Sequence, residues 1–198
     1  MKVLFARKPL LTRAALAARA ASTSDRKPIL RHVKLTADAA SNTLTVSATD
    51  LEVGASIWCD SGCVETGGSV CVPATQFLKI LKNLADEDVI LQTDAKGTTL
   101  RVIGAATEVE IPTENALDFP DCPQFTQESS HTCRTDLLAD VIGRTCWAAA
   151  KESTKFALTG TMLELNGSIQ AITTDNKRLA VEMLGCKKVG EPPDANLL

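Results

Sequence analysis

The sequence is poor in aromatic residues and in histidine, and both shortages narrow what it can be. Only 4% of its 198 residues are aromatic and none is tyrosine, so a buried core must rest on leucine, valine, isoleucine and alanine. His32 and His131 are the two histidines, too few for the histidine-rich ligand sets of most catalytic zinc sites. No apolar run approaches the roughly 20 residues of a membrane-spanning helix. With 44% hydrophobic residues, the composition is that of a globular protein.

The cysteines also lack the spacing of a metal site. They are Cys59, Cys63, Cys71, Cys122, Cys133, Cys146 and Cys186. No Cys-x-x-Cys pair occurs, and a Cys–His hydrolase motif is equally missing. We therefore expect reduced thiols in a cytoplasmic protein, with no metal, no cofactor and no catalytic residues. An enzyme built on cysteine chemistry is the disfavoured alternative.

The acidic balance, a net charge of −3, excludes a wholly basic nucleic-acid binder but allows a local basic face. Residues 1–24 contain no acid, a composition that mimics a transit peptide. However, residues 2–6 also read as a strand leading into a helix that starts with Pro9. We prefer the structural interpretation of this segment.

Two stretches share one pattern, an alternating strand that ends in Thr-Asp and a tight turn. In 168–181 apolar positions alternate on both sides of Asp175-Asn176, residue types that make turns by bonding their own backbone. The stretch 44–53 has the same form, with Thr49-Asp50 at the strand end. The two Thr-Asp pairs lie 125 residues apart, and Leu10-Leu11 and Leu137-Leu138 lie 127 apart. We predict a duplicated unit of roughly 125 residues, near the usual domain size.

Helices and strands recur in a similar order in each predicted unit. Helices are expected from Pro9, from Pro73 and from Thr135, each followed by short strands, and Gly62 to Gly68 reads as a loop. From Pro112 to about Ser130 the pattern stops, which indicates an extended connector. We place the domain boundary near residue 127, giving units 1–126 and 127–198, with the second cut short.

The residues best suited to an intermolecular contact are basic. Gly67-Gly68 lacks the Lys-Ser/Thr of a phosphate-binding loop, and Asp50 and Asp175 read as turn-fixing residues. Cations off the predicted buried helix faces occupy equivalent places in both units: Lys8, Arg13, Arg19, Arg26, Lys27, Arg144, Lys151 and Lys155. Such spacing suits a sequence-independent polyanion, although an ordinary solvated surface is the alternative.

Seven short sequence motifs follow one another along nearly the whole chain. They are the opening strand with Leu10-Leu11, Lys27-Pro28-Ile29-Leu30, Thr49-Asp50-Leu51-Glu52, Val72-Pro73-Ala74, Asp118-Phe119-Pro120, the run 156–160 and the run 173–180. In this order and spacing the chain resembles the bacterial sliding clamp family, the beta subunit of DNA polymerase III. The resemblance implies an α+β DNA-clamp fold of repeated β-α-β-β-β units, with helices on one face of antiparallel sheets and an incomplete second domain.

The resemblance also implies a function and a set of site residues. The family member would be a non-enzymatic processivity factor, a homodimeric ring around duplex DNA that tethers polymerase and clamp-loader subunits through short peptide motifs. The residues expected near DNA are Arg13, Arg26, Lys27, Lys155 and Phe156. The expected partner-peptide pocket comprises Leu158, Thr174, Lys177, Arg178 and Leu179. The expected subunit interface comprises Phe77, Ile80, Leu84 and Val109.

The chain departs from the family pattern in three respects. Asn176-Lys177 stands where relatives commonly have Gly-His or Gly-Tyr, and Ser24 stands where a basic residue can occur. The family has three such units, whereas this sequence ends midway through the second. The alternative function is therefore a truncated clamp-like protein that binds partners without encircling DNA.

Overall fold

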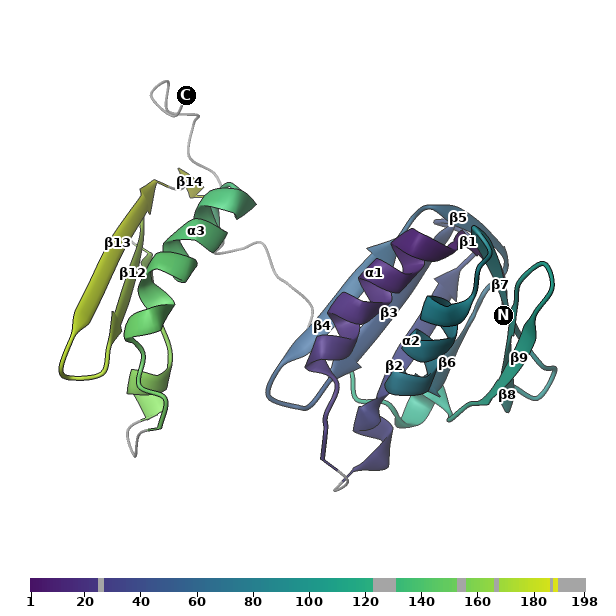
Figure 1. Cartoon of the computed structure of the whole chain (residues 1–198). Helices are drawn as coiled ribbons and strands as arrows, with labels where there is room; N and C mark the ends of the chain where they lie inside the picture. The colour runs from purple at the N-terminus through teal and green to yellow at the C-terminus, as the bar shows by residue number, and fades with distance from the viewer. Residues whose placement is uncertain (25–26, 123–130, 153–155, 166–167, 186, 189–198) are drawn as a thin grey trace. The chain divides into compact units, whose positions relative to one another are not determined.

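The computed structural model describes residues 1–24, 27–122, 131–152, 156–165, 168–185 and 187–188 (Figure 1). The chain divides into two compact units, Met1–Pro123 (unit 1) and Gln124–Leu198 (unit 2). Each unit is considered by itself. Their assignment to two clamp domains that meet near residue 127 stays a prediction.

Unit 1 contains two antiparallel sheets. The first has the order β5-β1-β7-β8-β9, formed by β1 (Lys2–Ala6), β5 (Gly62–Thr66), β7 (Asp88–Thr93), β8 (Thr99–Ile103) and β9 (Glu108–Pro112). The second has the order β4-β3-β2-β6, formed by β2 (His32–Asp38), β3 (Thr43–Thr49), β4 (Gly54–Cys59) and β6 (Gly68–Pro73). In β2 and β3 alternate side chains are buried, as the period of the sequence predicts.

Two helices lie side by side over these sheets, α1 (Arg7–Ala17) and α2 (Ala74–Asn83) (Figure 1). Leu10 and Ala14 of α1 and Phe77 and Leu81 of α2 are buried in one core with the strands. The predicted mixture of helices and antiparallel sheets is thereby confirmed. Pro9 falls in the first turn of α1 rather than at its first position, where its missing N–H still costs no helical hydrogen bond.

Two predicted loops carry more structure than expected. The stretch read as a glycine-punctuated loop contains β5, which pairs with β1. A Cβ at Gly62 would collide with the Leu4 carbonyl oxygen and the Phe5 ring, so this glycine marks a close approach rather than a loop. The predicted connector begins with the short 3-10 helix η3 (Ala116–Asp118) and buries Ala116 and Phe119 in a small cluster against Cys71. These apolar residues hold the start of the connector on unit 1.

In unit 2, helix α3 (Thr135–Thr145) packs on a three-stranded antiparallel sheet of β11 (Met162–Leu165), β12 (Ser168–Thr174) and β13 (Leu179–Gly185). The short strands β10 (His131–Thr132) and β14 (Lys187–Lys188) pair separately. The apolar residues at helical spacing in this segment predict a buried face of Leu137, Leu138, Val141, Ile142 and Cys146, but Leu137, Ile142 and Cys146 are exposed. The narrow sheet covers only one stripe of the helix, which runs through Leu138, Val141 and Thr145.

The repeat predicted from sequence landmarks extends to most elements of unit 2. Helices α1 and α3 both have 11 residues and start 128 residues apart, at residues 7 and 135. The 3-10 helices η1 (Ala18–Ala20) and η2 (Pro28–Arg31) recur at the same spacing as η4 (Cys146–Ala148) and η5 (Phe156–Thr159). Strands β3 and β12 both have 7 residues and start 125 apart, at residues 43 and 168. Unit 2 therefore repeats the β1-to-β4 part of unit 1.

Candidate functional site

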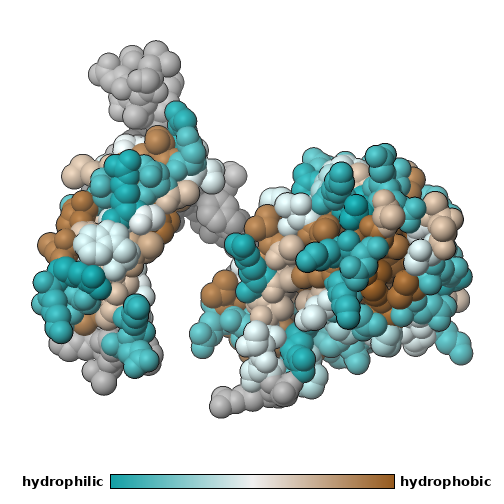
Figure 2. Space-filling model, viewed as in Figure 1, coloured by the Kyte–Doolittle hydropathy of each residue, from teal (hydrophilic) through white to brown (hydrophobic). Residues whose placement is uncertain are grey.

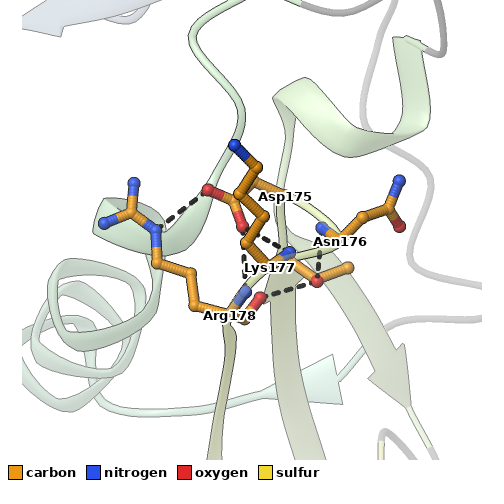
Figure 3. A network of polar contacts seen from close by, with 5 residues as sticks. Asp175, Asn176, Lys177 and Arg178 are labelled. Atoms are coloured by element: carbon orange, nitrogen blue, oxygen red, sulfur yellow. Dashed lines mark hydrogen bonds and ion pairs between the residues drawn. The ribbon is translucent and has the colours of Figure 1, made fainter.

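The side chains of Thr174, at the end of β12, and Asp175 shape the turn between β12 and β13 (Figure 3). The Thr174 hydroxyl accepts the Asn176 N–H at 3.1 Å and donates to the Arg178 carbonyl oxygen at 2.7 Å. Oδ1 of Asp175 accepts the backbone N–H groups of Lys177 and Arg178, both at 3.0 Å. Asn176 has a φ of 70°, a left-handed conformation that asparagine tolerates. The predicted turn and its structural aspartate are present.

These contacts fix the charge of the turn as well as its shape. Hydrogen bonds from the Lys177 amide, and then from the Arg178 amide and guanidinium, hold the pKa of the Asp175 carboxyl below its ordinary value. Its Oδ2 lies 3.0 Å from Nε of Arg178. The ionised carboxylate therefore holds Arg178 while Lys177 projects from an exposed position at a hydrophilic hairpin tip (Figure 2).

Trp147 is a neighbour of this turn that sequence reasoning missed. The Arg178 guanidinium carbon lies 5.4 Å from the centre of the Trp147 ring, a cation–π contact. The indole Nε1 donates to the Arg144 carbonyl oxygen at 2.6 Å, and the side chain remains 57% exposed. The composition of 147–155 reads as a polar crossover, and a tryptophan within such a polar stretch is the signal that could have found this neighbour.

The structure brings together most of the predicted peptide pocket. Thr174, Lys177, Arg178 and Leu179 all belong to this one turn, and Leu179 is 63% exposed at the start of β13. Leu158 lies in η5, half-buried, and its carbonyl oxygen accepts the Ala150 N–H at 2.9 Å. Leu179 thus offers an apolar contact beside a cationic rim. The role of these residues as a peptide pocket stays a prediction.

The turn between β3 and β4 repeats this hydrogen-bond pattern in unit 1. The Thr49 hydroxyl accepts the Leu51 N–H at 3.0 Å and donates to the Val53 carbonyl oxygen at 2.8 Å. Oδ1 of Asp50 accepts the N–H groups of Glu52 and Val53 at 2.9 and 2.7 Å. The Thr-Asp echo in the sequence therefore corresponds to one turn built twice.

The residues expected near DNA have different surroundings. Arg13 forms an ion pair with Asp60 at 3.0 Å and donates to Ser61 Oγ at 2.9 Å, so neighbouring groups already engage its guanidinium. Lys27 is exposed immediately before η2. Arg26, Lys155 and the side chain of Phe156 lie outside what the structure describes. Lys27 is the described member with an exposed side chain.

The predicted subunit-interface residues divide between core and surface. Phe77 is 0% exposed and packs within unit 1, so its side chain presents no surface on which a partner could pack. Its position on the α2 apolar stripe turns it fully toward the sheets. The partly buried Ile80 and Val109 line a pocket of about 250 Å³ with Lys79, Asn83 and Thr107, and the buried core residue Leu84 also reaches this pocket. Figure 2 shows hydrophobic surface over α2 in this region.

Two buried thiols are unsuited to nucleophilic chemistry. Burial raises the pKa of Cys59 and of Cys71 to about 11 in each case. Among the residues that the structure describes, no group of three or more His, Cys, Asp or Glu side chains is arranged to hold a metal ion. The helices in the same part of the chain are all too short or too polar to cross a bilayer.

Comparison with known proteins gives one consistent family. Residues 1–123 match the family described as "DNA polymerase III beta subunit, N-terminal domain". The beta sliding clamp of Chlamydia muridarum is 27% identical over 154 residues, which cover 77% of this chain and 41% of that protein. The beta sliding clamp of Synechococcus elongatus is 28% identical over 183 residues, covering 91% of this chain and 48% of that protein. The chain spans less than half the length of these curated relatives.

Solved structures agree with the sequence comparisons. The crystal structure of the DNA polymerase III subunit beta from Pseudomonas aeruginosa has a TM-score of 0.85 and 25% identity, covering 97% of this chain and 52% of that one. The sliding clamp of Bacillus subtilis shares the fold at 21% identity, with a TM-score of 0.86. The match covers 97% of this chain and 51% of the Bacillus subtilis chain. This chain belongs to the family of the DNA polymerase III beta subunit, the beta sliding clamps.

Proposed function

We propose that this chain forms part of a cytoplasmic, non-catalytic sliding clamp that encircles duplex DNA as a homodimeric ring and tethers a replicative polymerase and its clamp loader. Family membership supports this function, and the observation that carries it is the turn built twice on repeated β-α-β-β-β units. A closed ring can be built when similar units repeat around an axis, and this chain contains such repeated units.

The experiment that tests encirclement compares topologies of DNA. The full-length protein is loaded by its clamp loader on a nicked circular duplex and on the same duplex made linear, and retention is measured by gel filtration at raised salt. A ring stays on the circle and slides off free ends. Equal loss from both forms would contradict the ring and favour the alternative, a partner-binding protein that does not encircle DNA.

Direct DNA contact is assigned to Lys27 together with Arg26. Each phosphate contact contributes about one unit to the slope of log affinity against log salt concentration. We expect Arg26→Ala with Lys27→Ala to lower this slope in the full-length protein by roughly two. Lys96→Ala, in the turn between β7 and β8, is the matched control and should leave the slope unchanged. An unaltered slope in the double variant would remove these residues from the contact.

The partner-peptide pocket is assigned to the turn at Thr174 and to Leu179. Leu179→Ala should weaken binding of a short apolar peptide about tenfold, since an exposed apolar anchor of this kind contributes about 1.4 kcal/mol. Val181→Ala is the matched control, because Val181 is also exposed on β13, two residues further along the same face. Trp147, with Trp58 replaced by Phe, serves as the fluorescent reporter. Equal affinities of both variants would contradict the assignment.

A further inference from the structure

Unit 1 contains a cleft of about 570 Å³, of whose lining residues the proposed function uses Lys27 alone. Ser22, Ser24 and Lys27, from the connection between η1 and η2, line one part of it. The turn between β3 and β4 supplies Asp50, Leu51 and Glu52. Leu30 of η2, which is almost fully buried, adds apolar surface to the lining. The cleft thus combines an apolar lining with charged groups.

The cleft is the counterpart, in unit 1, of the predicted peptide pocket of unit 2. Leu30 lies 128 residues before Leu158, the spacing that relates η2 to η5. Glu52 lies 125 residues before Lys177, the spacing that relates β3 to β12. Because the two turns also share their hydrogen bonds, each unit presents the same backbone scaffold at this position.

The charge on the shared scaffold is reversed between the two units. The turn in unit 1 reads Asp50-Leu51-Glu52-Val53, with two acids and no base. The turn in unit 2 reads Asp175-Asn176-Lys177-Arg178, with one acid and two bases. The Val53 and Glu52 amides hold the pKa of Asp50 below its ordinary value, so its carboxylate is ionised at neutral pH. A cationic ligand suits the first turn, as an anionic one suits the second.

Leu51 occupies a backbone position that a leucine ordinarily avoids. Its φ is 79°, a left-handed conformation in which the Cβ of a leucine crowds the following carbonyl oxygen. The side chain is nevertheless 53% exposed, so packing within unit 1 uses only part of it. Residues held in such sparsely populated conformations cluster at active sites and ligand clamps. Here the strain holds an apolar side chain at the edge of the cleft, between two carboxylates.

We propose that this cleft is a second peptide-docking site, selective for a short peptide in which an apolar side chain is flanked by a basic residue. The apolar side chain would pack on the exposed Leu51 beside the small accessible edge of Leu30, and the basic residue would meet Glu52 and Asp50. Lys27, the residue assigned to DNA, also lines the cleft, but duplex DNA is the less suitable occupant because the two carboxylates beside Leu51 outnumber this cation and repel phosphates. The site is independent of the pocket assigned to unit 2.

The test uses the 198-residue chain and two short fluorescein-labelled peptides in a polarisation titration. Both carry a Leu-Phe pair, flanked by arginine in the basic probe and by aspartate in the acidic probe. We expect Leu51→Gly to weaken the basic probe about tenfold, as for loss of one apolar anchor. Glycine accepts the φ of residue 51, so this variant keeps the fold. Glu52→Lys should reverse the preference between the probes at this site.

Three results separate this site from its alternatives. Leu179→Ala in unit 2 is the matched control and leaves the basic probe unaffected, whatever it does to the acidic probe. A basic peptide with Ser-Ser in place of Leu-Phe that binds equally well would show charge attraction alone and overturn the proposal. If Leu51→Gly leaves the basic probe unchanged, or if Leu51→Gly and Glu52→Lys alter only the affinity for a labelled duplex, the cleft is no peptide site.

Discussion

Replacing Phe77 or Ile80 by alanine tests how helix α2 divides its apolar residues between the core and the surface pocket. Phe77 is fully buried, and truncating such a side chain costs about 3–5 kcal/mol. A unit of this size gains only about 5–15 kcal/mol on folding. Since each kcal/mol shifts the midpoint by at least about 3 °C, Phe77→Ala should lower the thermal midpoint of unit 1 by roughly 10 °C or more.

Ile80 makes the contrasting case on the same helix. It is only partly buried and lines the pocket with Leu84 and Val109, so Ile80→Ala should cost about 1–2 kcal/mol and shift the midpoint by roughly 3–6 °C. The assay is thermal unfolding of the chain followed by far-UV circular dichroism. Lys79→Ala, whose side chain is charged and lines the same pocket, is the control and should leave the midpoint unchanged.

Ile80→Ala, the variant with the smaller expected loss of stability, is the one expected to weaken self-association. Sedimentation of the full-length protein should show weaker self-association for Ile80→Ala than for the unmodified chain at a temperature where both are folded. A shift for Ile80→Ala as large as that for Phe77→Ala would refute the division of α2 into core and pocket residues. A Phe77→Ala variant that unfolds within about 3 °C of the unmodified chain would refute it too, because truncating a buried phenylalanine should lower the free energy of unfolding by more than that shift allows.

Two further predictions concern protons and thiols. The pKa of the Asp175 carboxyl is lowered, so the stabilisation from its charge is complete above the ordinary value of 3.8 and is lost as pH falls through the lowered pKa. The amide resonances of Lys177 and Arg178 should therefore keep their positions in NMR spectra until the pH falls below 3.8. Movement of these resonances at pH 5 to 6 would contradict the hydrogen bonds to Asp175. Because Cys59 and Cys71 are buried with pKa values of about 11, iodoacetamide at neutral pH should label the exposed Cys63 first, which peptide mass spectrometry measures; equal labelling of all three would show that unit 1 opens readily.

The sequence indicated the repeat because its signals are local. The alternation around Thr49 and Thr174 predicts a strand and a turn without reference to the rest of the chain. The equivalence of Leu51 with Asn176 also follows from the repeat, so the left-handed conformation of Leu51 could have been found by carrying the asparagine's turn chemistry 125 residues back. Leucine by itself gives no such signal.

Other features depend on contacts between distant parts of the chain. The apolar stripe of α2 contains both Phe77 and Ile80, and a period of 3.6 residues does not distinguish which of them faces the sheets. Gly62 resembles a loop residue until β1 is placed beside it. The contact of Trp147 with Arg178 joins residues 31 positions apart and depends on how η4 packs on the sheet.

The place of β1 in its sheet bears on how unit 1 folds. Strand β1 lies between β5 and β7, pairing Val3 with Val64 and with Leu91. Its two partner strands follow it in the sequence by about sixty and about ninety residues, and such long-range pairing slows folding. Just before β1, the Met1 nitrogen donates to Thr93 Oγ1, which follows the pairing of β1 with β7, at 2.9 Å. A change that removed β1 from its place would therefore separate β5 from β7 and leave each with an unpaired edge, the kind of surface on which sheets associate.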